Sequence, residues 1–188
     1  MNSPLWGVHP ATLVKMARRR YTKRRYYKKG RYSANISEIN GTSVTAASGK
    51  WSGTTVLTTN PAQSNATVSQ TYTVKNFEVN FTVTIPTSSN IEYLENIVCY
   101  IMYVPQGMNV SEEYNLQHPE YVMTYKYVGS PMQDGTSQQF QPIKIRSRMA
   151  RRLQTGDSII LFISGYNQAV GELNLELNGL VRWWTKAN

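Results

Sequence analysis

The chain has 188 residues, with 20 Lys and Arg against 11 Asp and Glu, which gives a formal net charge of +9 at pH 7. This length suits one domain with a hydrophobic core and is short for two. The single cysteine, Cys99, excludes an internal disulfide and a cysteine-based zinc site, and no stretch approaches the roughly 20 apolar residues of a membrane span.

The positive charge is concentrated at the N-terminal end. Residues 1–33 hold ten Lys and Arg and no Asp or Glu, whereas residues 34–188 hold the other ten against all eleven acids, a balance of −1. In "MARRRYTKRRYYKKGRYS", residues 16–33, nine cationic residues are interleaved with four tyrosines. Such blocks of like charge resist folding alone and act as interaction tails. The sequence therefore predicts a flexible basic arm over residues 1–33 and a folded domain over residues 34–188.

The folded domain reads as a succession of β-strands. The clearest is "NFEVNFTVTIP", residues 76–86, in which Phe77, Val79, Phe81, Val83 and Ile85 alternate with polar residues and share one face of a strand. Turn-like segments separate further strand-like runs, giving about eight strands, and a short helix is expected at "SEEYNLQ" in the long loop around residues 105–120. The other runs are "SVTAA", "WSGTTVLTT", "TVSQTYTV", "IVCYIMYV", "YVMTYKYV", "FQPIKIRSR", "DSIILFIS" and "LNLELNGLVRWW".

Several short strands joined by turn-rich loops favour an all-β sandwich over an α/β fold. The loops are uneven in length, which suits Greek-key connections better than a hairpin-only barrel. The predicted fold is an eight-stranded antiparallel jelly-roll sandwich preceded by the basic arm.

The arm has the chemistry of a single-strand nucleic-acid binder. Lys and Arg neutralise phosphates and release counterions, Arg adds bidentate hydrogen bonds, and Tyr offers a stacking surface for any base. The same cationic run is typical of a nuclear localisation signal. For Tyr32, next to the folded domain, packing against that domain is an alternative. The predicted nucleic-acid-binding residues are Arg18, Arg19, Arg20, Tyr21, Lys23, Arg24, Arg25, Tyr26, Tyr27, Lys28, Lys29 and Arg31.

A second cationic cluster lies inside the folded domain. Its members are Lys144, Arg146, Arg148, Arg151 and Arg152. Because Ile143 and Ile145 alternate with Lys144 and Arg146, these charges are expected on the solvent face of one strand, and Arg151 and Arg152 then precede the turn "QTGD". One interpretation is an inner surface that contacts nucleic acid. The other is a subunit contact or solubility patch, paired with Glu112, Glu113 or Glu120 of a neighbouring copy.

Residues for catalysis are sparse. The chain has two histidines, His9 and His118, and two aspartates, Asp134 and Asp157, both in turn contexts where Asp bonds the local backbone. No nucleophile–His–Asp order, phosphate-binding glycine loop or metal-ligand spacing is present. We therefore expect no enzymatic activity, no cofactor and no metal.

Two neighbouring tryptophans, Trp183 and Trp184, close the last strand-like run. In a strand one of them points inward and the other outward. An outward Trp suits an interface anchor, and the alternative is that both close one end of the sandwich.

The chain resembles the capsid proteins of circovirus-like small circular single-stranded DNA viruses. The resemblance rests on the interleaved Arg and Tyr of "MARRRYTKRRYYKKGRYS", on "IKIRSRMARRLQTGDSIILFI" and on the aromatic final run "LNGLVRWW". It implies a shell of about 60 identical copies, a packaged single-stranded DNA genome, nuclear entry during assembly and residence in the virion. Residues 1–15 depart from the pattern, so Met16 is a candidate native start and residues 1–15 an upstream in-frame extension; they also lack the features of a secretory signal.

Two other functions fit the same residues. One is the coat protein of a small single-stranded RNA or satellite virus, and the other is a single-strand-binding protein that does not assemble. Particle formation separates the coats from the non-assembling protein. The recovered nucleic acid separates the two coats, because phosphate contacts and stacking do not distinguish DNA from RNA.

Overall fold

The computed structural model describes residues 31–60, 71–84, 94–129 and 142–187, and these contain eight strands, a short α-helix and a 3-10 helix. The predicted arm residues from Arg18 to Lys29, and Asp134, lie outside the described residues. No helix in the described ranges is long and apolar enough to cross a membrane. The elements are β1 (Ser33–Ala46), β2 (Gly49–Thr59), β3 (Tyr72–Thr84), β4 (Leu94–Val104), α1 (Glu112–Gln117), η2 (Pro119–Tyr121), β5 (Val122–Gly129), β6 (Ile143–Leu153), β7 (Ser158–Asn167) and β8 (Leu173–Ala187).

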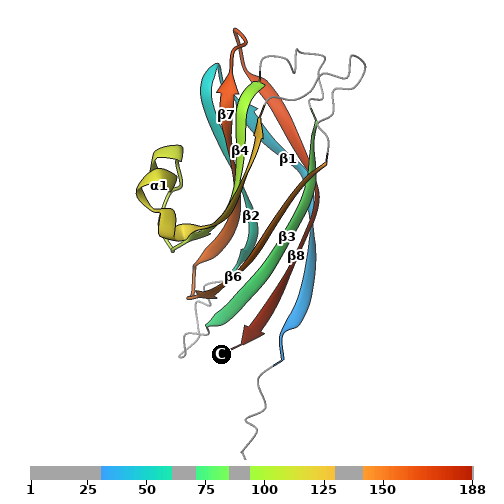
Figure 1. Ribbon diagram of the computed structural model, residues 1–188, viewed down its shortest axis with the longest axis vertical. Helices are drawn as coiled ribbons and strands as arrows, with labels where there is room; N and C mark the ends of the chain where they lie inside the picture. Colours follow the sequence, from blue (N-terminus) through green and yellow to red (C-terminus); the bar gives the residue numbers. More distant parts are fainter. Residues whose placement is uncertain (1–30, 61–70, 85–93, 130–141, 188) are drawn as a thin grey trace, which may run out of the picture.

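The strands form two four-stranded antiparallel sheets that face each other (Figure 1). One has the order β1-β8-β3-β6 and is called the arm-side sheet here, because the arm leads into β1. The other, called the helix-side sheet, has the order β2-β7-β4-β5 and carries α1 on its outer surface. Strands β1 to β4 lie alternately in the arm-side sheet and the helix-side sheet. The chain then returns, so that β5 pairs with β4, β6 with β3, β7 with β2 and β8 with β1. This is the strand connectivity of a jelly roll, and it confirms the predicted fold.

The core lies between the sheets and follows the alternation of the sequence. On β3, Phe77, Val79, Phe81 and Val83 are at most 2% exposed, and the polar residues between them face outward. Leucines of β8 and isoleucines of β7 meet them in one continuous cluster. Each strand of the arm-side sheet therefore has an apolar inner face and a polar outer face.

Several strands differ from their sequence-based bounds, among them β6, which runs over Ile143–Leu153 where the sequence predicts "FQPIKIRSR", residues 140–148. The first strand begins at Ser33, ten residues before the predicted "SVTAA", because its outer half is exposed and shows no hydrophobic alternation. The run "TVSQTYTV" is not a separate strand in its described part, since Tyr72–Val74 opens β3. Asn76 has a φ of 54°, and the register shift beside it lets both Val74 and Phe77 face the core.

The predicted helix is present as α1. The Ser111 hydroxyl accepts a hydrogen bond from the backbone N–H of Tyr114 at 3.1 Å and caps its N-terminus. Tyr114 then packs on Met102, Val104, Ile160 and Phe162, which form a second apolar cluster on the outer surface of the helix-side sheet. The central strands of the helix-side sheet are thus covered by the core on one surface and by α1 on the other. This explains why "IVCYIMYV" and "SIILFIS" are apolar without alternation.

Asp157 fixes the turn between β6 and β7 to the end of β4. Its carboxylate accepts hydrogen bonds from the backbone N–H of Gln154 at 2.8 Å, the hydroxyl of Tyr103 at 2.6 Å and the backbone N–H of Gln106 at 3.1 Å. Burial raises the pKa of Tyr103 above its usual value, and the bond to Asp157 raises it further. The prediction that Asp157 bonds local backbone is confirmed.

Gly179 lies where β8 passes closest to its neighbours, between Ile39 of β1 and Phe81 of β3. A side chain there would meet the carbonyl oxygen of Asn80 and approach Cα of Phe81 to 2.6 Å, so backbone would have to move. We expect Gly179→Ala to lower the free energy of unfolding by about 1–3 kcal/mol. Urea unfolding of the full chain measures it. Leu180→Ala, at a position 51% exposed on the outer face, is the control, and an equal loss there would contradict the steric explanation.

Candidate nucleic-acid interface

The arm joins the folded domain at one end of the arm-side sheet. Ser33, the first residue of β1, pairs with Thr185 near the end of β8. The starts of β1 and β3 and the ends of β6 and β8 lie at this same end, near the C-terminus in Figure 1. Of the twelve predicted nucleic-acid-binding residues of the arm only Arg31 is described, and it is exposed.

The first two members of the β6 cluster lie on the outer surface of the arm-side sheet, as predicted. Glu78 of β3 forms ion pairs with both, at 2.7 Å to Nζ of Lys144 and 2.8 Å to a guanidinium nitrogen of Arg146. The hydrogen bonds from Lys144 and then Arg146 lower the pKa of Glu78 to about 2. The carboxylate that balances these cations thus comes from the same chain.

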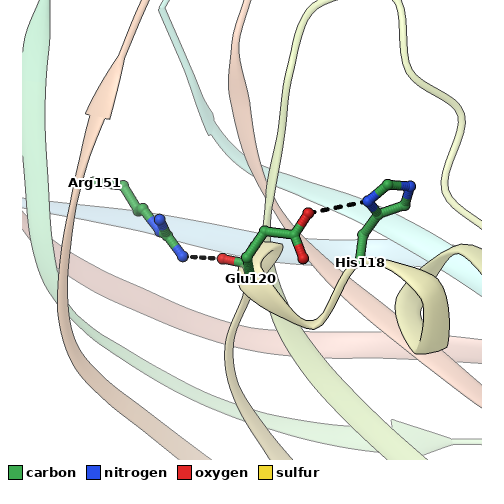
Figure 2. Close-up of polar contacts among 3 residues, drawn as sticks. All are labelled: His118, Glu120 and Arg151. Carbon is green, nitrogen blue, oxygen red and sulfur yellow. Dashed lines mark hydrogen bonds and ion pairs between the residues drawn. The ribbon is translucent and has the colours of Figure 1, made fainter.

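Arg151 points to the other side of the strand. Between Ser147 and Ala150, β6 has one residue more than β3, and beyond this bulge Arg151 is opposite the buried Val74. The half-buried Arg151 donates a hydrogen bond to the backbone carbonyl of Glu120 (Figure 2). Its guanidinium also lies 5.9 Å from the ring centre of Tyr103. The solvent face expected for Lys144 and Arg146 therefore does not include Arg151, which links β6 to η2.

The carboxylate of Glu120 is directed away from Arg151. One of its oxygens lies 3.0 Å from Nδ1 of His118 (Figure 2), and this contact lowers the pKa of Glu120 below its usual value. The His118 ring in turn stacks on that of Tyr121 and lies tilted against that of Tyr114, with ring centres 5.5 Å and 4.6 Å away. These contacts place His118 in the packing of α1 and η2.

The remaining cluster members are exposed. Arg152 lies on the outer surface, opposite Thr73, and donates a hydrogen bond to the hydroxyl of Thr71 at 3.1 Å. Arg148 lies in the bulge of β6. Within the described ranges neither residue forms an ion pair, so both cations are open to an anionic partner.

The structure adds three cations that the sequence analysis did not single out, Lys75, Arg182 and Lys186, and two of them lie over the rings of Tyr32 and Trp184. Nζ of Lys75 lies 3.7 Å from the ring centre of Tyr32, and the guanidinium of Arg182 lies 4.6 Å from that of Trp184. Lys186 is opposite Thr73 on the same outer surface. The only sequence signal for the β8 residues is the alternation within "LVRWWTK", which does not show what lies beside them.

The two tryptophans are divided as predicted. Trp183 is 8% exposed and stacks on Phe77 with ring centres 6.2 Å apart, whereas Trp184 is half-buried on the outer surface. The thiol of Cys99 is also in the core, and burial raises its pKa to about 12, which disfavours a reactive thiolate. Among the described residues no group of His, Cys, Asp or Glu has the geometry of a metal site.

No protein-family model and no curated protein matches the sequence. Several solved structures are similar in fold. The infectious bursal disease virus VP2 subviral particle has 10% identity and a TM-score of 0.40, over 82% of this chain and 33% of that chain. A lipoprotein of Bacteroides thetaiotaomicron has 8% identity and a TM-score of 0.44, over 85% of this chain and 89% of that chain. Desmodium yellow mottle tymovirus has 12% identity and a TM-score of 0.34, over 100% of this chain and 97% of that chain. Such distant likenesses carry no information on function, which has to be inferred from the residues of this chain.

Glu78 provides a test of the outer-surface ion pairs. Because its pKa lies below the ordinary 4.5, the pairs stabilise the folded chain above about pH 4.5, and this contribution is lost as the pH falls towards 2. In the double variant Lys144→Met/Arg146→Met we expect the Glu78 carboxyl to titrate close to 4.5. Carbon-13 NMR of the labelled carboxyl follows the titration. Lys126→Met, on the helix-side sheet, should leave it unchanged, and a wild-type midpoint already near 4.5 would show that the pairs do not form.

Proposed function

We propose that the chain is a viral coat protein that assembles into a small icosahedral shell and packages single-stranded DNA through its basic arm. The observation that carries the proposal is a nearly neutral jelly-roll domain joined, at one end of one sheet, to an arm with ten Lys and Arg and no acid. The two parts suit two different partners. The domain suits other copies of itself, and the arm suits a polyanion.

Self-assembly is supported by the properties of the folded domain. Its formal charge of −1 over residues 34–188 allows copies to approach each other without strong repulsion. The helix-side sheet exposes large apolar and aromatic side chains near its edges, with Val56 59% exposed, Tyr125 67% and Tyr127 61%. Exposed groups of this kind are typical of protein–protein contacts.

Packaging is supported by the arm. Residues 15–33, if fully extended, span up to about 60 Å, enough to follow a strand inside a shell. Charge and stacking bind any sequence, as packaging requires. The choice of DNA over RNA rests on the resemblance of residues 16–33 and 143–163 to circovirus-like coats. The same cationic run supports nuclear entry before assembly.

Electron microscopy of the purified full chain tests the assembly. We expect closed particles of uniform size that contain nuclease-protected nucleic acid, which is removed by deoxyribonuclease after the particles are opened. Protected RNA would favour the coat of a small RNA or satellite virus. A chain that binds oligonucleotides but stays monomeric across pH and salt would favour a non-assembling single-strand-binding protein.

The arm should dominate the salt dependence of binding. If six to ten of its cations contact phosphates, the slope of log affinity against log salt is expected to be about −4 to −7 on single strands. Replacing Arg18, Arg19, Arg20, Lys23, Arg24 and Arg25 by Gln should make the slope much shallower. Replacing Tyr21, Tyr26 and Tyr27 by Ala should weaken binding at an unchanged slope, since stacking releases no counterions. Fluorescence anisotropy at several salt concentrations measures both, and an unchanged slope in the six-residue variant would contradict a binding role for the arm.

A further inference from the structure

The cations of the folded domain are not spread evenly over its two sheets. Of the described Lys and Arg, only Lys50 and Lys126 belong to the helix-side sheet. The others belong to the arm-side sheet or to the residues that lead into it. A domain that is nearly neutral as a whole is therefore polarised, with its positive side where the arm enters.

Within the arm-side sheet, cations and aromatic rings gather at the end where the arm enters. Trp184 of β8 is opposite Ala34 of β1 on one side and Lys75 of β3 on the other. The next outward position of β8, Lys186, is opposite Thr73, whose other neighbour is Arg152 of β6. We call this surface the arm-end patch, and its residues are Tyr32, Lys75, Arg152, Arg182, Trp184 and Lys186.

Carboxylates on the same surface do not neutralise the patch. Glu78 borders it but already holds Lys144 and Arg146 in ion pairs. Glu38 is opposite Leu180, and Glu176 is opposite Thr84, so both lie towards the other end of the sheet. Within the described ranges, the lysines and arginines of the patch form no ion pair.

A cation lies over the face of each aromatic ring of the patch. Lys75 lies over Tyr32 and Arg182 over Trp184, and such contacts fix the orientation of both partners. Bases of single strands stack on aromatic rings and on guanidinium planes, while Lys and Arg beside them neutralise the phosphates. Two cation–ring pairs joined across β3 and β8 thus present both contacts that a single strand needs.

We propose that the arm-end patch is a second binding site for single-stranded nucleic acid, located on the folded domain and continuous with the arm. This inference rests on the proposed function and adds to it a fixed site of six residues, five from strands β3, β6 and β8 and one, Tyr32, directly before β1. Tyr32 of the patch directly follows Arg31 in the chain, so a nucleic-acid strand bound by the arm can continue onto the patch. The alternative occupant, the same face of a second copy, would bring like cations together across a two-fold axis and is disfavoured.

Charge-matched variants of the full chain test the phosphate contacts. Lys75→Gln/Lys186→Gln removes two cations of the patch, and Lys50→Gln/Lys126→Gln removes two from the helix-side sheet. For a fluorescein-labelled oligothymidylate we expect the patch variant to lower the magnitude of the salt slope by about 1.4, at ~0.7 per phosphate contact. The control should keep the wild-type slope. An oligouridylate in parallel shows whether the site distinguishes DNA from RNA.

A second pair of variants tests stacking. Trp184→Leu keeps an apolar side chain but removes the ring, and we expect affinity to fall about fivefold or more at an unchanged slope. Tyr166→Leu, at a ring 42% exposed on the helix-side sheet, is the control and should bind like the wild type. Ultraviolet cross-linking of the bound oligothymidylate, read by mass spectrometry, should label Trp184 or Tyr32.

The outcomes separate this inference from the proposed function. Patch variants that bind like their controls, with no cross-link to Trp184 or Tyr32, would overturn the patch while arm-dependent binding still stands. A full chain that binds no oligonucleotide would overturn both. Patch variants that keep wild-type binding but no longer form particles would assign the surface to contacts between copies and overturn the patch as a nucleic-acid site.

Discussion

The position of β8 between β1 and β3 is the constraint on which the rest of the molecule depends. Its inward residues fill the core, and its outward residues carry Arg182, Trp184 and Lys186 to the surface. A shift of one residue would reverse both faces, burying cations and exposing leucines. The close approach at Gly179 accepts no side chain, which favours one register over its neighbours. The same pairing joins the first strand, where the arm enters, to the last.

The two sheets share one core but have different outer surfaces. In the helix-side sheet the central strands β4 and β7 are apolar on both faces, and α1 and η2 cover part of their outer surface with Tyr114 and Tyr121. The arm-side sheet is covered by no described element and carries the cations. The hydrogen bond between Asp157 and Tyr103 joins the β6–β7 turn to β4, and the one from Arg151 to the carbonyl of Glu120 joins β6 to η2. This asymmetry suits a subunit that contacts copies of itself with some surfaces and a polyanion with another.

The arm and the folded domain differ in net charge and therefore suit different contacts. A charge of +10 on residues 1–33 gives strong, salt-sensitive attraction to phosphate but cannot form a core. In the proposed function the nearly neutral domain packs against its copies, and the cations of the arm-end patch add phosphate contacts on a folded surface. Side chains already ordered on a folded surface lose less conformational entropy on binding, so even a few such contacts contribute.

The sequence alone determined whatever depends on neighbouring residues. The alternation in "NFEVNFTVTIP" placed Phe77, Val79, Phe81 and Val83 in the core, Ser111 marked the start of α1, and the adjacent tryptophans were divided between two faces because a strand alternates. Only the tertiary structure decided what depends on pairing between distant strands. A bulge in β6, invisible in "IKIRSRMARR", turned Arg151 away from Arg146, and the registers of β1, β3, β6 and β8 brought Tyr32, Lys75, Arg152 and Trp184 to one surface. Local periodicity fixes which face a side chain takes, but a register is a choice among many strand pairings, and it is set by the packing of the whole core.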